Sequence, residues 1–398
     1  MDDQPPPPEP ANVPPANPPT VTPPPVIGTP PPLTPPPLSL PPRPRSGAIW
    51  KVLTVVFLGL FVLSLLGHFA GLTRVVIPHS RGGTDRSRNL EEVVIEATNS
   101  DQKIAVIEVD GIISSGEVDR TGVDMVQNIK DQLQMAERDL DVKAVILKVN
   151  SPGGEVLASD EINRAISQFE DQTHKPVVAS MGTLAASGGY YISAPCRWIV
   201  ADELTLTGSI GVIMHAYNYR QLMDKVGIRP QVFKSGRFKD MLSGERDEKN
   251  MTPEEKQTRD QEDQMVQALI DETYNKFKEA VKTGRERAAK ENQGKGKALV
   301  EDWQDFADGR VLSGKQALQF GFVDELGDLD TALKRAKTLT GIARANVVQY
   351  RIPFDLGSVL LHLFGKSDTP ALKVDLGMDL PRLEAGRMYF IAPLTVLH

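Results

Sequence analysis

The chain has 398 residues, with 45 basic and 52 acidic side chains and a formal net charge of −7 at pH 7. This negative balance argues against non-specific binding of nucleic acid. Because Cys196 is the only cysteine, an intramolecular disulfide and a cysteine-based metal site are both excluded. We expect the protein to need neither a metal nor an organic cofactor.

The N-terminal segment is dominated by proline, since 21 of the 31 prolines lie in the first 44 residues. Such a segment cannot bury enough apolar surface to offset the entropy lost on ordering. Residues 1–47 are therefore predicted to be a disordered tail. A solvated spacer is the favoured interpretation, and a ligand for domains with aromatic grooves is the alternative, with no partner identified.

A long apolar run follows the tail. Residues 52–72 contain only one ionisable group, His68, and about 20 apolar residues suffice to span a bilayer as a helix. We predict a transmembrane anchor over 48–73 and a linker over 74–101, with a cleaved signal peptide as the alternative. Basic residues flank both ends, and those nearest the span weakly favour a cytoplasmic N-terminus. The protein is then a single-pass protein of the cell membrane, with its catalytic domain outside the cytoplasm.

Regular patterning begins after the linker. Continuous apolar runs alternate with amphipathic stretches, which is typical of an α/β protein with a buried, largely parallel sheet. The strands are expected over 104–109, 144–149, 176–181 and 199–201, with a fifth ending near Val232 and Phe233. The helices are expected over 122–137, 158–171 and 253–287. A catalytic domain is predicted over 102–345. The C-terminal extension over 346–398 contains a possible strand at 388–391, which could cover a rim or occupy a groove.

Two glycine-rich turns follow predicted strands, at residues 150–154 and 185–191. Glycines allow a turn to expose backbone N–H groups, and such groups form oxyanion holes. In the second turn, Ser187 is flanked by small residues, so a substrate could reach its hydroxyl. The alternative is a serine that merely caps a helix.

A serine hydroxyl becomes a good nucleophile only when a base removes its proton. His215 lies 28 residues downstream of Ser187, and Lys239 lies 52 residues downstream. A lysine base must be neutral, which burial favours, and it needs a partner to orient it. Ser209 is a candidate for that partner.

Four segments occur in order: NSPGG at 150–154, ASGGYY at 186–191, TGSIGV at 207–212 and KSGRFKD at 234–240. ADGRV at 307–311 and GFVDELG at 321–327 follow them. Together they resemble the signal peptide peptidase A family of serine proteases. The resemblance covers about residues 102–340 and implies a Clp protease/crotonase-like fold of repeated strand–strand–helix units.

The resemblance also implies roles for individual residues. Ser187 matches the nucleophile, Lys239 the general base, and Ser209 the serine that orients the lysine. The oxyanion hole corresponds to Gly153, Gly154 and Gly188. Members of the family form homo-oligomers with shared active sites, and this chain has one copy of the motifs, as in the short form whose lysine comes from the neighbouring chain.

The implied function is a membrane-anchored serine endopeptidase with a Ser-Lys dyad. Its substrates would be remnant signal peptides and other membrane-proximal peptides. Three alternatives remain beside it: a Ser-His protease using His215, a crotonase-like acyl-CoA enzyme on the same fold, and an inactive membrane scaffold.

Overall fold

The structure of the protein is a computed structural model that describes residues 53–61, 90–115, 124–352 and 387–392. It divides into two units, Met1–Gly82 and Gly83–His398. In the first unit, residues 53–61 form a helix with exposed apolar side chains. Within the described ranges, no helix has both the length and the apolar character needed to cross a membrane. The predicted tail, and the predicted span apart from 53–61, lie outside the described residues.

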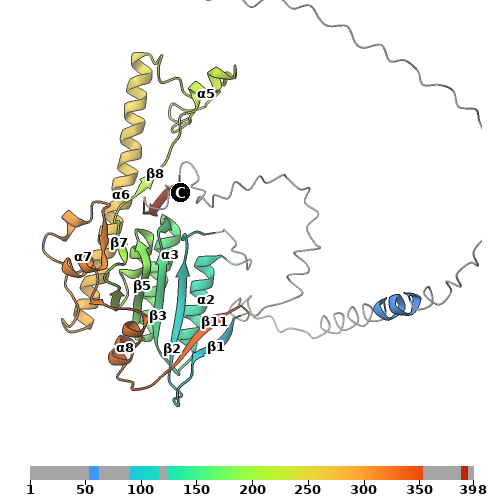
Figure 1. The fold of residues 1–398 in the computed structure, drawn as a ribbon. Coiled ribbons are helices and arrows are strands. Elements are labelled where there is room, and N and C mark those ends of the chain that lie inside the picture. The colour runs from blue at the N-terminus through green and yellow to red at the C-terminus, as the bar shows by residue number, and fades with distance from the viewer. Residues whose placement is uncertain (1–52, 62–89, 116–123, 353–386, 393–398) are drawn as a thin grey trace, which may run out of the picture. The chain divides into compact units, whose positions relative to one another are not determined.

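A nine-stranded sheet forms the centre of the second unit (Figure 1), with the strand order β1-β11-β2-β3-β5-β6-β10. The short strand β7 pairs with β5 and with β9. Pairing is parallel between β11, β2, β3, β5 and β6, and antiparallel between β1 and β11. The strands are β1 Glu91–Glu96, β2 Lys103–Asp110, β3 Val142–Ser151, β5 Val177–Ala186, β6 Trp198–Ala201, β7 Leu206–Gly208, β9 Val311–Ser313, β10 Glu325–Leu326 and β11 Asn346–Arg351. The predicted α/β class and the first four predicted strands are confirmed.

Helices cover both faces of this sheet. Alternate residues of β2 and β3 pack with α2 (Met125–Arg138) and α3 (Val156–Thr173) in the larger core. The intervening residues pack with α8 (Leu329–Thr340) in a second core. Burial on both faces explains why these strands read as continuous apolar runs rather than as alternating ones.

The longest helix is α6 (Pro253–Glu291). It begins with a capping box: the Thr252 hydroxyl accepts a hydrogen bond from the Glu255 N–H, and the Glu255 carboxylate accepts one from the Thr252 N–H. Further along α6, Arg285 forms a buried ion pair with Asp324, whose carboxylate also accepts hydrogen bonds from the N–H groups of Ile199 and Lys297 at 2.8 and 3.0 Å. The predicted helix over 253–287 is confirmed.

Most of the segment between β7 and α6, residues 216–250, lies beside the N-terminal half of α6, away from the main sheet (Figure 1). It contains the short helix α5 (Arg220–Lys225) and is tied to α6 by Arg246, which pairs with Asp240 and with the buried Glu262. We call residues 216–250 the arm. The fifth predicted strand is wrong: Val232 and Phe233 lie in this arm without strand pairing, and Phe233 is 93% exposed. Apolar residues can define a strand only where a neighbouring strand accepts their backbone hydrogen bonds.

A second sheet has three strands, β4 (Gly153–Glu155), β12 (Met388–Ile391) and β8 (Ile213–Met214). The central strand β12 is antiparallel to both neighbours. β12 confirms the possible strand near the C-terminus, and its partner is the first glycine-rich turn.

β1 lies in the range predicted as linker and β11 beyond residue 345, so the main sheet extends past both predicted bounds of the catalytic domain. The remaining helices are α4 Gly188–Ser193, α7 Gly314–Gln319 and a short 3-10 helix, Trp303–Phe306.

Candidate active site

Ser187 lies between the end of β5 and the start of α4. Its φ angle is 54° and its ψ angle is −115°, an unusual conformation for a residue with a side chain. Its N–H donates to the carbonyl of Gly208 at 2.8 Å, which holds the turn against β7. Such strain costs about 1–3 kcal/mol and persists only where surrounding contacts enforce it, most often at functional sites.

The Ser187 hydroxyl has no structural partner. The residue is 1% exposed, it makes no side-chain capping bond to α4, and its Oγ finds no hydrogen-bond partner among the described residues. The helix-capping alternative therefore does not account for this serine. A buried polar group without a partner costs about 1–3 kcal/mol, so the position is better explained by chemistry than by stability.

Three glycines beside Ser187 leave no room for side chains. A Cβ on Gly153, whose φ is +104°, would lie 1.9 Å from the carbonyl oxygen of Phe390 and 2.6 Å from the amide nitrogen of Gly188. A Cβ on Gly154 would lie 1.8 Å from the Ile113 carbonyl oxygen. One on Gly188 would meet the Ser159 hydroxyl at 2.7 Å. The glycines predicted for the oxyanion hole are therefore required by close backbone packing.

The amides of these glycines differ in their partners. The Gly153 N–H donates to Ser151 Oγ at 3.1 Å. Gly188 is the first residue of α4, so no carbonyl within that helix can accept its N–H. The Phe390 carbonyl oxygen and the Gly188 nitrogen both lie close to the position that a Cβ on Gly153 would occupy. A carbonyl group of β12 thus lies beside the amide of Gly188.

Neither candidate base is hydrogen-bonded to Ser187 within one chain, because no described residue is a partner of the Ser187 hydroxyl. Lys239 is exposed and lies on the arm, where it lines a cavity of about 480 Å³ with Asp240 and other arm residues. His215 stacks on Tyr217, and its Nε2 is buried without a partner among the described residues. Ser209 is buried after β7 with a φ of 51°, and its N–H donates to the Arg310 carbonyl at 2.7 Å. The structure thus brings Ser187 together with the three glycines, and Lys239 lies elsewhere on the same chain.

An aromatic cluster adjoins the glycine turn and was not predicted from the sequence. The Phe390 ring stacks on Tyr191 with ring centroids 4.9 Å apart, and it lies 4.7 Å from Phe277 of α6. Tyr191 donates its hydroxyl to Asp160 at 2.8 Å, and burial raises its pKa. The only sequence signal was the apolar run at 388–391, which identifies a strand but not its partner.

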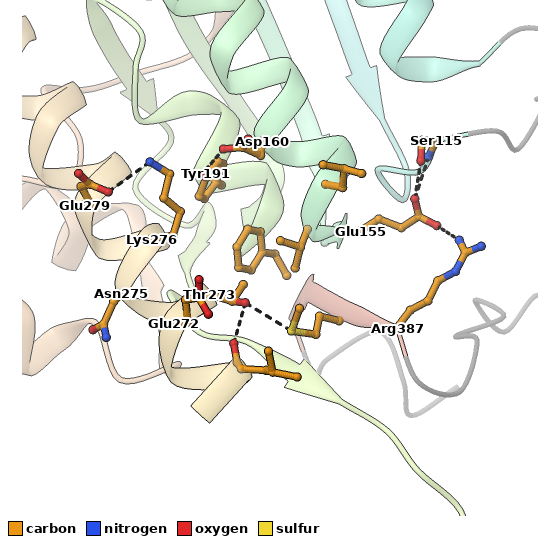
Figure 2. A pocket seen from close by; sticks show the side chains of 15 residues that line it. Ser115, Glu155, Asp160, Tyr191, Glu272, Thr273, Asn275, Lys276, Glu279 and Arg387 are labelled. Carbon is orange, nitrogen blue, oxygen red and sulfur yellow. Dashed lines mark hydrogen bonds and ion pairs between the residues drawn. The ribbon is translucent and has the colours of Figure 1, made fainter. Parts of the chain in front are cut away.

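A cavity of about 1,130 Å³ opens beside β12, between the start of α3 and α6 (Figure 2). Glu155 lies at one end of it, where its carboxylate accepts hydrogen bonds from Ser115 and pairs with Arg387. Within the described residues, no group of three or more His, Cys, Asp or Glu side chains is placed to hold a metal ion.

Comparison with known proteins places the chain in a family. The profile of peptidase family S49 matches residues 170–343. A Synechocystis protein named as a protease is 38% identical over 245 residues, which cover 62% of this chain and 77% of the relative. An Enterococcus faecium protein named as signal peptide peptidase SppA is 34% identical over 271 residues, 67% of this chain and 72% of that protein. The chain belongs to the signal peptide peptidase A family, peptidase family S49.

Membership of family S49 makes the protein a serine peptidase, and peptides are its substrates. Protease 4 of Haemophilus influenzae is 34% identical over 257 residues, which cover 64% of this chain but 38% of that longer protein. The resemblance seen in the sequence motifs is confirmed.

Proposed function

We propose that this S49 peptidase is a membrane-anchored endopeptidase in which Ser187 is the nucleophile and Lys239 the general base. The observation that carries the proposal is the environment of Ser187. It is a buried, strained serine whose hydroxyl has no partner among the described residues, next to a backbone amide that lies near the carbonyl of an extended strand. These are the parts that acyl transfer from a peptide requires.

The proposed reaction is acyl transfer through an ester intermediate. Neutral Lys239 takes the Ser187 proton as Oγ forms a bond to the peptide carbonyl carbon, and the resulting oxyanion is held by the N–H of Gly188, beside the turn at Gly153 and Gly154. The C–N bond then breaks, and the amine leaves with the proton returned by Lys239. The same lysine activates water, which hydrolyses the acyl-enzyme ester and restores Ser187.

The proposal places Lys239 of one chain against Ser187 of its neighbour. Three observations support a shared site: Lys239 is exposed on the arm, the Ser187 hydroxyl has no hydrogen-bond partner among the residues that the structure describes, and the arm exposes large apolar side chains such as Leu222, Val226 and Phe233. Contact with a second copy would bury that surface and remove Lys239 from water, which favours the neutral amine. Ser209 would orient the lysine.

The expected substrates are remnant signal peptides and other membrane-proximal peptides. Support comes from the resemblance of the motifs and from the apolar run at 52–72, which would hold the site near the bilayer and its apolar peptides. We propose a single-pass anchor over 48–73, a cytoplasmic N-terminus and an extracytoplasmic catalytic domain on a Clp protease/crotonase-like fold. Alkaline extraction of membranes should leave the full chain in the pellet, and release into the supernatant would contradict the anchor.

The shared dyad is tested by co-expressing differently tagged Ser187→Ala and Lys239→Ala chains and purifying assemblies that carry both tags. Each variant alone should hydrolyse no peptide. The mixed assembly should regain about a quarter of the wild-type rate, since a site then needs an intact serine and an intact neighbouring lysine. No activity in mixed assemblies would contradict sharing.

Two measurements separate the other chemistries. Activity of Lys239→Ala together with loss in His215→Ala would assign the base to His215 instead. A fluorophosphonate should label Ser187 in the full chain. Absence of labelling, with Ser187→Ala as the control, would favour a crotonase-like enzyme or an inactive scaffold.

A further inference from the structure

The strand β12 shows how an extended peptide fits the site. It lies between β4 and β8 and is antiparallel to both, with Phe390 opposite Gly154 and Met388 opposite Met214. Backbone pairing on both sides fixes the direction and register of an occupant whatever its sequence, while alternate side chains enter pockets. A substrate that binds in this way must displace β12 and take its register.

The Phe390 position combines two features. Its carbonyl oxygen lies beside the Gly188 amide, so the equivalent carbonyl of a substrate is the one that Ser187 would attack. Its side chain is buried between Tyr191 and Phe277, with ring centroids 4.9 and 4.7 Å away. Offset and tilted aromatic contacts at these distances favour a large aromatic side chain at the residue whose carbonyl is attacked.

Three residues before Phe390, the side chain of Arg387 meets a prepared carboxylate. Arg387 Nη1 lies 2.6 Å from Glu155 Oε1, and the Glu155 side chain is only 14% exposed (Figure 2). The other oxygen, Oε2, accepts hydrogen bonds from the Ser115 N–H at 3.1 Å and from its hydroxyl at 2.8 Å. The hydrogen bonds from Ser115 therefore fix the Glu155 carboxylate through Oε2. The other oxygen, Oε1, is left to form a charge-assisted hydrogen bond with a basic side chain of a bound peptide.

We propose that this groove selects peptides with arginine or lysine three positions before a large aromatic residue, and that cleavage follows the aromatic residue. Glu155 binds the basic side chain, and the pocket of Tyr191 and Phe277 binds the aromatic one. The inference rests on the proposed function, because it assumes that a substrate occupies the register of β12 and is attacked by Ser187.

The test uses the purified full chain and four synthetic peptides that differ at two positions only, Arg or Gln at the first and Phe or Ala three residues later. The wild type should cleave the Arg/Phe peptide after Phe, as mass spectrometry of the products will show. Changing Arg to Gln should lower kcat/KM about five- to tenfold. The effect is of this size because the Glu155 carboxylate is mostly buried, which strengthens the ion pair, while the basic side chain is half exposed, which weakens it. Changing Phe to Ala should lower it by a similar factor or more.

Two variants of Glu155 assign the preference. Glu155→Gln should remove the discrimination between Arg and Gln peptides, and Glu155→Lys should favour a fifth peptide, which has Glu at the first position and Phe three residues later. Glu272→Gln is the matched control, because Glu272 is a carboxylate that lines the same cavity from α6, and it should keep the wild-type preference. Phe277→Leu should weaken the preference for Phe over Ala.

The outcomes are distinct. If Glu155→Gln changes the rates of Arg and Gln peptides by the same factor, Glu155 only holds the chain's own β12 and the inference is overturned. Cleavage at a bond other than the one after Phe would show that the substrate does not take the register of β12. If the wild type hydrolyses peptides in a Ser187-dependent way but shows no basic or aromatic preference, this inference fails and the proposed function stands. If no peptide is hydrolysed by any assembly of the full chain, the proposed function itself fails.

Discussion

Replacing Gly153 by alanine tests the proposed oxyanion site directly, because its new methyl group would take the position of the attacked carbonyl. The methyl would lie 1.9 Å from the Phe390 carbonyl oxygen, the stand-in for a substrate carbonyl, and 2.6 Å from the Gly188 nitrogen. No substrate oxygen could then reach that amide. Loss of one oxyanion donor costs roughly 3–4 kcal/mol of transition-state stabilisation, so kcat/KM should fall about 100- to 1,000-fold.

The backbone makes a separate contribution, because Gly153 has a φ of +104° and alanine at a positive φ costs about 1–2 kcal/mol of stability, in addition to the shift of β12 that the methyl group forces. Gly341→Ala is the control for this effect, since Gly341 has a φ of +70°, no atom near its Cβ position and a place at the end of α8. Both variants should lower the free energy of unfolding, measured with urea, but only Gly153→Ala should lose peptidase activity. A folded Gly153→Ala enzyme within about threefold of the wild-type rate would refute the assigned oxyanion position.

Three other predictions concern stability. Burial raises the pKa of Glu170 to about 7 despite the nearby Arg287, so the folded chain binds this proton more tightly than the unfolded chain. The free energy of unfolding should then fall by up to about 3 kcal/mol between pH 4.5 and 7, and Glu170→Gln should remove that slope in urea titrations. Asp324→Asn leaves Arg285 buried without its counter-charge and should destabilise by about 3–5 kcal/mol, measured in the same way; a loss under about 1 kcal/mol would contradict a tight pair. Ser187→Ala removes a buried hydroxyl that has no partner in the described part of the chain, so the variant's thermal midpoint should equal or exceed that of the wild type while activity is lost.

Much of the main sheet could be predicted because its strands are buried on both faces. The segments 104–109 and 144–149 are apolar except for Glu108 and Lys148, and β2 and β3 lie at these places with helices on either side. The same reasoning failed at Val232 and Phe233, because an apolar pair carries no information about whether a partner strand is present. It also overlooked β1, whose side chains are all exposed and so lack a burial pattern.

The candidate site was predictable only in part. The glycines around Ser187 could be predicted, because they lie in glycine-rich turns that follow predicted strands. In the structure, a Cβ on any of them would clash with a neighbouring atom. The pairing of Met388–Ile391 with Gly153–Glu155 joins segments more than 200 residues apart, and no local pattern encodes such a register. The distance between Lys239 and Ser187 in an assembly depends on contacts between chains, so the dyad stays a prediction, as do the anchor and the Clp protease/crotonase-like fold.

The pairing of β1 with β11 has a consequence for biosynthesis. Glu91 lies opposite Arg351, and Lys103 of β2 lies opposite Asn346, so the outer edge of β2 gains its neighbour only after residue 351 has left the ribosome. Until then the nascent chain exposes an unpaired parallel strand, which is a site for mispairing. Chains truncated before β11 should therefore accumulate as aggregates or bind chaperones, whereas chains ending just after it can close the sheet.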